Sequence, residues 1–276
     1  MQVLENRVVV ITGAASGIGR AIALRLAKEK CVLALVDINK DTALGLSGLD
    51  ECAGLCEQLT SSVSVHRTDV SDRLGMSRLP AEIVARHGRI NLLVNNAGVS
   101  LAGCLDDISI DDLEWIVAVN FWGAVYGCKY FLPELKRSGE GHIVNLLSDF
   151  ALIGLPTKTG YCATKFALRG FSEALRAELA GSGIGVTAVY PGPVATAIIA
   201  NGRNADPEKA KLEAEFIRKR AIDADLVASR VVQGIIRNSA RVLIGKETYL
   251  IDLATRLAPA TTDTLVAKMR KRIPFL

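Results

Sequence analysis

The sequence predicts an α/β protein in which helices cover both faces of one doubly wound, parallel sheet of about seven strands. Apolar, β-branched runs recur along the 276 residues, and segments of helical length separate them. Continuous apolar runs are typical of strands buried on both faces, as in parallel sheets. Regular alternation of strand and helix favours right-handed βαβ units. The hydrophobic share of 50% and the charged share of 22% are ordinary for a globular chain that buries a core.

Each strand is predicted from a short run rich in Val, Ile and Leu. The seven runs cover residues 7–12, 32–37, 63–67, 90–95, 142–148, 184–190 and 241–245. Helical patterns follow the first and fifth runs, at residues 18–30 and 161–183, and the second pattern ends in a Gly-Ser-Gly stop. Residues 111–137 also read as a long helix, which is apolar on all sides.

The alternation of strand and helix breaks after the sixth strand. A loop and then a charged helix follow it, so we expect a substrate lid at about residues 193–225. Residues 248–276 read as a C-terminal extension of two amphipathic helices broken near Pro259, with basic residues at 268–272. The extension is expected to cover the substrate pocket or to pack on a partner subunit, and contact with an anionic membrane is a less favoured alternative. We expect residues 1–276 to form a single domain.

A glycine-rich segment, TGAASGIG, joins the first strand to the first helix. Its glycines are Gly13, Gly17 and Gly19, so the spacing is G-x-x-x-G-x-G and not the usual G-x-G-x-x-G. Backbone amides at a helix N-terminus attract anions, and glycines let a phosphate approach the backbone closely. A simple glycine-rich turn is the alternative reading. The position between strand and helix favours dinucleotide binding in a Rossmann-like fold.

An acidic residue at the end of the second strand indicates which dinucleotide binds. Asp37 lies eighteen residues beyond Gly19, about where a carboxylate is needed to accept hydrogen bonds from the adenosine ribose. A carboxylate there repels a 2′-phosphate, and Ser16 within the glycine loop is not basic, so the sequence predicts NAD. The nearby cations Arg20 and Lys40 are expected to soften this preference.

The stretch TGYCATK places Tyr161 four residues before Lys165, with only small side chains between them. On a helix these two positions lie one turn apart on the same face. Taken alone, this spacing fits an ordinary surface pair at least as well as an acid–base device. The acid–base interpretation therefore needs support from other parts of the chain.

That support comes from a series of short motifs in a fixed order. They are TGAASGIG at Thr12, Asp69-Val70, NNAG at Asn95 to Gly98, Asn120 in VAVNFWG, Ser148 in NLLSD, YCATK at Tyr161 and PGPVAT at Pro191 to Thr196. Each motif alone is weak, but their order and spacing together are specific, with Ser148 thirteen residues before Tyr161. Over about residues 5–200, the chain resembles the short-chain dehydrogenase/reductase family.

The resemblance implies roles for the matching residues. It implies a catalytic group of Asn120, Ser148, Tyr161 and Lys165. It implies a cofactor site formed by Gly13, Ser16, Gly17, Ile18, Gly19, Asp37, Ile38, Asp69, Val70, Asn96, Ala97, Gly98, Tyr161, Lys165, Pro191, Gly192, Val194 and Thr196. For Asn120 and Ser148 there are simpler alternatives, since Asn120 can satisfy backbone groups where its helix packs and Ser148 can be a strand-end turn residue.

The implied chemistry is proton transfer by a phenol. A free tyrosine has a pKa of about 10, and we expect the Lys165 ammonium together with a positive nicotinamide to lower the pKa of Tyr161. Ser148 is expected to donate a hydrogen bond to the substrate oxygen, and Asn120 to hold a water that relays protons. Tyr161 would then take the proton of an alcohol, or protonate a carbonyl, as hydride is transferred.

The predicted substrate is a hydrophobic secondary alcohol or ketone, because residues 151–156 and 197–202 are apolar and uncharged. The charges at Arg203, Arg218, Lys219 and Arg220 leave open a 3-oxoacyl-thioester reductase that uses NADPH, although they read more as a solvated face. A noncatalytic dinucleotide sensor or scaffold is the alternative from another class. Such a protein is expected to lack Tyr161, Lys165 or Ser148.

Partners and location follow from the remaining features. The family resemblance implies a homodimer or homotetramer in which residues 111–137 and 161–179 pack between subunits. A net charge of +4 is too small to indicate nucleic-acid binding. We expect a cytoplasmic protein, because no secretory leader precedes the first strand and six scattered cysteines fit reduced thiols. The three histidines are far apart in sequence, so no metal site is expected.

Overall fold

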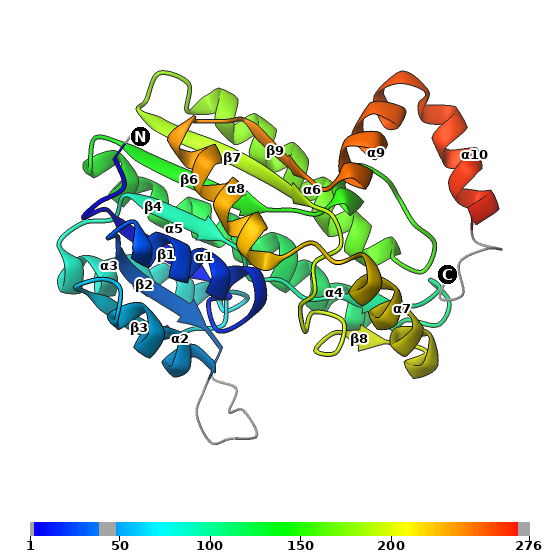
Figure 1. Ribbon diagram of the computed structural model, residues 1–276, viewed down its shortest axis with the longest axis horizontal. Helices are drawn as coiled ribbons and strands as arrows, with labels where there is room; N and C mark the ends of the chain where they lie inside the picture. Colours follow the sequence, from blue (N-terminus) through cyan, green and yellow to red (C-terminus); the bar gives the residue numbers. More distant parts are fainter. Residues whose placement is uncertain (1–2, 39–47, 270–276) are drawn as a thin grey trace.

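The computed structural model describes residues 3–38 and 48–269, and seven parallel strands form its main sheet (Figure 1). The strands are β1 (Val8–Thr12), β2 (Val32–Asp37), β3 (Val63–Arg67), β4 (Leu92–Asn95), β6 (Gly141–Leu146), β7 (Ile184–Pro191) and β9 (Arg241–Ile244). Their order is β3-β2-β1-β4-β6-β7-β9, which confirms the predicted doubly wound α/β fold. The order reverses between β1 and β4, so ligands are expected at the carboxyl ends of these two strands.

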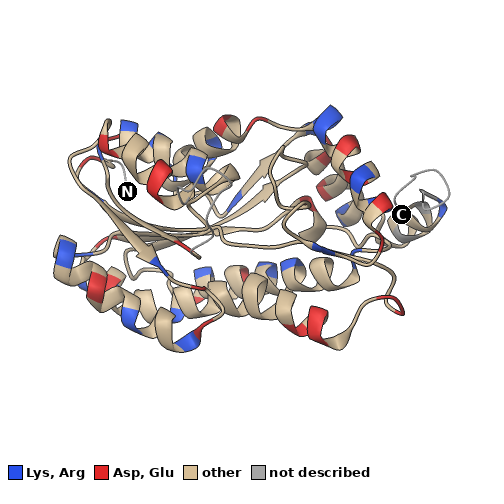
Figure 2. Cartoon of the chain, turned by 90° about the horizontal axis from the view of Figure 1, so that it is seen from below, with Lys and Arg blue, Asp and Glu red and all other residues tan. Residues whose placement is uncertain are grey.

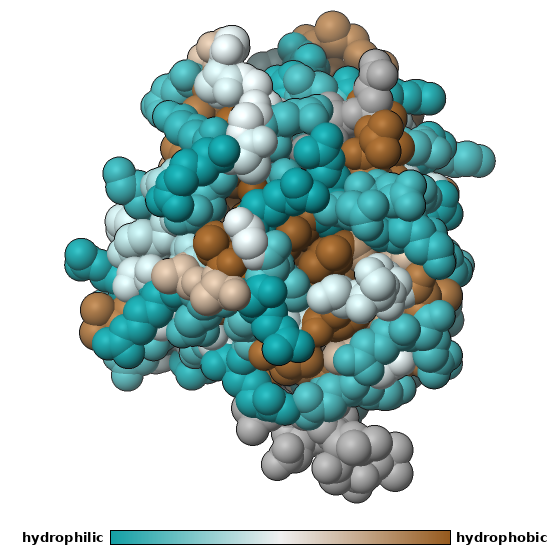
Figure 3. Space-filling model, turned by 90° about the vertical axis from the view of Figure 1, so that its left-hand side faces the viewer, coloured by the Kyte–Doolittle hydropathy of each residue, from teal (hydrophilic) through white to brown (hydrophobic). Residues whose placement is uncertain are grey.

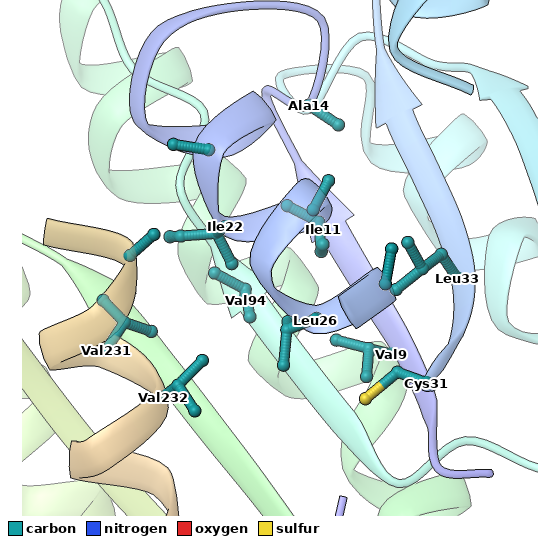
Figure 4. Packing of buried hydrophobic residues seen from close by; sticks show 14 of the residues in the cluster. Val9, Ile11, Ala14, Ile22, Leu26, Cys31, Leu33, Val94, Val231 and Val232 are labelled. Carbon is teal, nitrogen blue, oxygen red and sulfur yellow. The ribbon is translucent and has the colours of Figure 1, made fainter. Parts of the chain in front are cut away.

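Helices cover both faces of this sheet. One face carries α1 (Gly17–Lys28), α2 (Gly48–Glu57) and α8 (Ala224–Ile236), and the other carries α3 (Arg73–His87), α5 (Gly123–Arg137) and α6 (Thr159–Glu178). Successive residues of a strand point to opposite faces. Val9 therefore packs with α1 and α8, while Val8 and Val10 pack with the helices of the other face. Figure 4 shows the first of these layers, where α1 lies between β1 and α8.

The prediction of one long helix at residues 111–137 is wrong in that the helix is not continuous. The structure divides it into α4 (Ile110–Val117), a π-helical segment (Ala118–Trp122) and α5. A π-helical turn takes in one extra residue and is frequent at functional sites. The apolar sequence on both sides of the segment hides this irregularity. Asn120 lies within the π-helical segment.

Two very short strands were not predicted. β5 (Leu101–Ala102) and β8 (Arg203–Asn204) pair in parallel and join the segment after β4 to the segment after β7. The ion pair between Arg203 and Asp112, at 2.8 Å, lies beside this ladder. The segment that was predicted to form a lid is therefore attached to the body of the protein before α7 (Pro207–Arg220) begins.

The C-terminal part contains α9 (Lys246–Leu257) and α10 (Pro259–Met269), which Figure 1 shows beside the end of the sheet where α7 lies. Pro259 is the first residue of α10, a position where a missing N–H costs nothing. Lys40 and the basic residues 270–272 lie outside the described residues.

Charged residues lie mainly on the helices and loops, whereas the strands between them are almost free of charge (Figure 2). On the face shown in Figure 3, hydrophilic residues predominate and hydrophobic ones form small, separate patches. Within the described part of the chain, no helix has both the length and the apolar character needed to cross a membrane. All six cysteines are free thiols.

Candidate active site

The glycine turn after β1 leaves its backbone open to a ligand. Gly13 and Gly17 have φ angles of +65° and +54°, which disfavour any residue with a Cβ atom. A Cβ on Gly13 would lie 2.8 Å from the Ala97 Cα, and one on Gly17 would lie 2.9 Å from the Thr196 Cγ2. A Cβ on Gly19 would collide with the Gly13 carbonyl oxygen, so Gly19 serves packing inside the turn. The turn opens α1, whose N-terminal amides attract anions.

The NNAG motif holds this turn in place. The Thr12 hydroxyl accepts hydrogen bonds from the backbone amides of Asn96 and Ala97, at 3.0 and 3.1 Å. In return, the Asn96 side-chain amide donates to the carbonyl oxygens of Thr12 and Gly13, both at 3.0 Å. These bonds join the ends of β1 and β4 at the point where the strand order reverses.

Asp37 is held by backbone amides at the end of β2. Its two carboxylate oxygens accept hydrogen bonds from Ala15 and Ile38, at 2.9 and 2.8 Å. The predicted influence of Arg20 on cofactor choice is reduced, because Arg20 forms an ion pair with Glu51 at 2.7 Å. The carboxylate is therefore fixed beside the glycine turn, and Arg20 already has an acidic partner.

Tyr161, Lys165 and Ser148 come together where β6 ends and α6 begins. The Tyr161 ring packs edge-on against Phe150, and the Lys165 Nζ lies 5.6 Å from the centre of the Tyr161 ring. Lys165 is 4% exposed and donates a hydrogen bond to the Leu146 carbonyl oxygen at 3.1 Å. The Ser148 hydroxyl donates to the Asp149 carboxylate at 2.8 Å.

Burial controls the ionisation of this group. Burial raises the pKa of Tyr161 well above its ordinary value, and interaction with Ser148 offsets only part of that increase. The expected lowering of the Tyr161 pKa includes the charge of a bound nicotinamide and stays a prediction, and burial acts in the opposite direction. Burial also lowers the pKa of Lys165 to about 8 and raises the pKa of Asp149 to about 6. Near neutral pH the group thus contains a neutral phenol beside an ammonium.

Asn120 lies behind the wall of the site. Its side chain exchanges two hydrogen bonds with the backbone of Val99: the amide donates to the carbonyl oxygen at 2.9 Å, and the side-chain oxygen accepts from the backbone N–H at 2.8 Å. This is the simpler arrangement that the sequence left open, in which Asn120 satisfies backbone groups. A Cβ on Gly98 would lie 3.3 Å from the Asn120 Oδ1 and 3.6 Å from the Lys165 Nζ. Asn120 thus supports the segment that faces Lys165.

One cavity of about 1080 Å³ connects these features. All the predicted cofactor residues except Gly19 line it, and so do Ser148, Tyr161 and Lys165, whereas Asn120 does not. The cavity also includes residues that sequence reasoning missed: Asp149, Lys158 and Glu213. Leu250, Ala254, Thr262 and Val266, from the C-terminal helices, reach it as well. Residues of the extension thus line the cavity, and which of its three expected roles applies stays a prediction.

Comparison with known proteins identifies the family. Residues 7–207 match the short chain dehydrogenase family. The chain is 40% identical over 271 residues to SadH of Mycobacterium tuberculosis, a protein named as an oxidoreductase, and the match covers 97% of this chain and 96% of that protein. It is 36% identical over 242 residues to the 11-beta-hydroxysteroid dehydrogenase-like 4A of Arabidopsis thaliana, covering 87% and 76% of the two chains.

A solved structure shows the same architecture. A short-chain dehydrogenase/reductase from Burkholderia phymatum, crystallised in complex with NAD, is 28% identical and has a TM-score of 0.85, with 96% of this chain and 97% of that chain covered. The chain belongs to the short-chain dehydrogenase/reductase family and is an oxidoreductase of the NAD(P)-dependent type.

Proposed function

We propose that this protein is an NAD-preferring oxidoreductase that transfers hydride between the nicotinamide and a hydrophobic secondary alcohol or ketone. The observation that carries the proposal is that Tyr161, Lys165 and Ser148 line the same cavity as Asp37 and the glycine turn. The glycine turn would hold the pyrophosphate, Asp37 the adenosine ribose, and Thr196 and Lys165 the nicotinamide end. The bound dinucleotide supplies the hydride acceptor or donor.

Within this proposal, Tyr161 is the general acid and base. Because burial raises its pKa, the phenol carries its proton near neutral pH and can protonate a carbonyl oxygen. In the oxidising direction it takes the alcohol proton, and the Lys165 ammonium stabilises the phenolate that forms. Ser148 turns from Asp149 to donate to the substrate oxygen. Asn120 acts as a positioning residue through Val99.

The substrate part of the cavity supports an apolar ligand. Trp115, Leu155 and Ile198 line it, and α7 adds Phe216 and Ile217. Ligand sites usually combine such apolar walls with a few polar groups that fix orientation. Similarity to a protein named as hydroxysteroid dehydrogenase-like is consistent with a bulky alicyclic substrate. The competing proposal, a 3-oxoacyl-thioester reductase that uses NADPH, draws on Arg220, which also lines the cavity and packs on Phe216.

The experiment that tests this proposal is a substrate panel with both cofactors. The purified chain would be assayed with aliphatic, alicyclic, steroid and acyl-thioester substrates, and oxidation or reduction of NAD(H) and NADP(H) followed by absorbance. We expect turnover of apolar alcohols or ketones, fastest with NAD(H). Preference for acyl thioesters with NADPH would favour the competing proposal. Cofactor binding without turnover of any substrate would favour the noncatalytic sensor.

Replacing Asp37 by Ser is expected to shift the cofactor preference toward NADP. A hydrogen bond to a charged group contributes about 1.5–3 kcal/mol, or roughly a tenfold to hundredfold change in affinity. The ratio of kcat/KM for NADP to that for NAD should therefore rise by at least about tenfold. Glu57→Gln, at the exposed end of α2, is the control. An unchanged ratio in Asp37→Ser would contradict the role of this carboxylate.

We also propose a homo-oligomer that packs through the α5 and α6 region. Trp122, directly before α5, and Phe166, on α6, are 45% and 41% exposed, so both large apolar side chains are available for contact with a partner subunit. Trp122→Glu combined with Phe166→Glu should lower the molar mass measured by light scattering from that of a dimer or tetramer to that of one chain. Leu74→Glu, at an exposed position on α3, should leave the assembly intact. A monomeric wild-type protein would contradict the proposal.

A further inference from the structure

A buried ion pair lies in the wall of the cavity. The Lys158 Nζ donates to the Glu213 Oε2 at 2.6 Å, and the two side chains are 3% and 7% exposed. Lys158 directly precedes α6, and Glu213 belongs to α7, so the pair joins two segments that are 55 residues apart in sequence. Both residues line the cavity that also contains Tyr161.

Stability does not explain this pair. Desolvating two charges costs so much that a buried ion pair can often be replaced by apolar side chains of similar volume without loss of stability. The neighbouring pair on α7, Lys211 and Glu208, is typical of a helix surface, with side chains 71% and 79% exposed. Glu213 is instead buried among apolar residues of the cavity. A charged side chain at such a position is better explained by a role in ligand binding than by a contribution to stability.

The backbone that presents Lys158 is strained. Thr157 has a φ angle of +63°, which is an outlier for a β-branched residue. Its hydroxyl is buried and has no hydrogen-bond partner among the described residues. Strain of this kind persists where the surrounding structure fixes it, and it is common at ligand sites. Here it sets the start of α6, and with it the position of the Lys158 side chain.

The pair lies close to the reacting group. Lys158 comes three residues before Tyr161, slightly less than one helical turn, or roughly 4.5 Å along the axis. The Glu213 carboxylate is near enough to act on the Tyr161 phenol, adding to the increase in its pKa. A substrate whose reacting oxygen contacts Tyr161 would therefore extend past the pair.

The Lys158 ammonium and the Glu213 carboxylate can form more hydrogen bonds than the one that joins them. An ammonium has three donors, and a carboxylate can accept several hydrogen bonds. Within the described part of the chain, each group has one hydrogen-bond partner, which is the other. The pair is neutral as a whole, and a hydroxyl can accept from Lys158 and donate to Glu213 together. A substrate carboxylate would be repelled by Glu213.

From these observations we propose that Lys158 and Glu213 form a second polar subsite, which selects substrates carrying a neutral hydroxyl away from the reacting carbon. This inference rests on the proposed function and specifies its substrate class as apolar ketones and alcohols with a second oxygen. The subsite fixes the orientation of the substrate, and Tyr161 acts on the other oxygen.

The test compares matched pairs of ketones in which a hydroxyl replaces a methyl group. The probes are 4-hydroxycyclohexanone with 4-methylcyclohexanone, and the corresponding 6-substituted 2-decalones. For each protein variant, the readout is the ratio of kcat/KM for the hydroxyl ketone to that for the methyl ketone. One ratio comes from the cyclohexanone pair and one from the decalone pair. Lys158→Met combined with Glu213→Leu should lower the larger of these two ratios by about tenfold or more, because it removes hydrogen bonds to charged groups. Lys211→Met with Glu208→Leu makes the same exchange on the exposed face of α7 and should leave the ratio unchanged.

A second variant keeps the inference testable if the double variant does not fold. Glu213→Gln retains an acceptor for Lys158 and removes the negative charge, so the preference for 4-carboxycyclohexanone over 4-methylcyclohexanone should rise. If either variant shows the wild-type preference, the subsite proposal is wrong while the oxidoreductase proposal stands. If the pair only holds α7 in place, both ketones lose activity equally and the ratio stays constant, which also overturns the subsite. Absence of turnover with every ketone would overturn the proposed function itself.

Discussion

Replacing Tyr161 by Phe is expected to lower the turnover number by about 10²–10⁴-fold, the usual contribution of general acid–base catalysis. The substitution removes only the hydroxyl. The ring that packs against Phe150 remains, so the wall of the cavity keeps its shape. Because the glycine turn and Asp37 are not affected, NAD binding should remain nearly intact.

The measurement pairs steady-state kinetics with calorimetric titration of NAD. Tyr249→Phe makes the same chemical change at a position on α9 that is 58% exposed, and it should retain wild-type rates. A Tyr161→Phe protein that keeps more than about a tenth of the wild-type turnover would contradict the general acid–base role.

Replacing Lys165 by Met should lower kcat/KM by about 10²–10³-fold, as the loss of one electrostatic stabiliser in a dry site typically does. The ammonium is the cation beside Tyr161, and its removal leaves the developing phenolate uncompensated in a buried position. NAD binding should also weaken, because the proposal places Lys165 at the nicotinamide end of the cofactor. Lys28→Met, at the exposed end of α1, is the matched control.

The pH dependence of stability provides an independent check on Lys165. Its pKa falls from 10.5 in the unfolded chain to about 8 in the folded protein. Between these values the unfolded chain holds the proton and the folded protein releases it, so this group makes the folded state more stable as the pH rises. The difference in unfolding free energy between wild type and Lys165→Met should therefore shift in favour of the wild type from pH 8 to 10. If this difference in unfolding free energy does not change with pH, the lowered pKa of the buried Lys165 is contradicted.

The sheet could be predicted closely because its strands are uniform runs of apolar residues. β2 and β3 have the predicted bounds, and the other strands differ by a few residues at their ends. Local sequence does not show every irregularity. The π-helical segment around Asn120 interrupts an apolar helix without a proline or a run of polar residues. β5 and β8 have two residues each, too few to show any periodicity.

The candidate site was predictable where a motif is contiguous in sequence, as for the glycine turn and YCATK. It was not predictable where function depends on a distant contact. Glu213 reads as one more charge on a solvated helix until the fold brings it to Lys158. The pKa of Tyr161 depends on burial by many elements together, and the spacing to Lys165 does not reveal that.

The most direct measurement is the transfer of an isotopic label. NADH carrying deuterium at both C4 positions would be incubated with the protein and 4-hydroxycyclohexanone, and the product analysed by mass spectrometry. The account predicts one deuterium on the new carbinol carbon with the wild-type protein, and almost none with Tyr161→Phe. Unlabelled alcohol, or labelling that is equally fast without the Tyr161 hydroxyl, would contradict it.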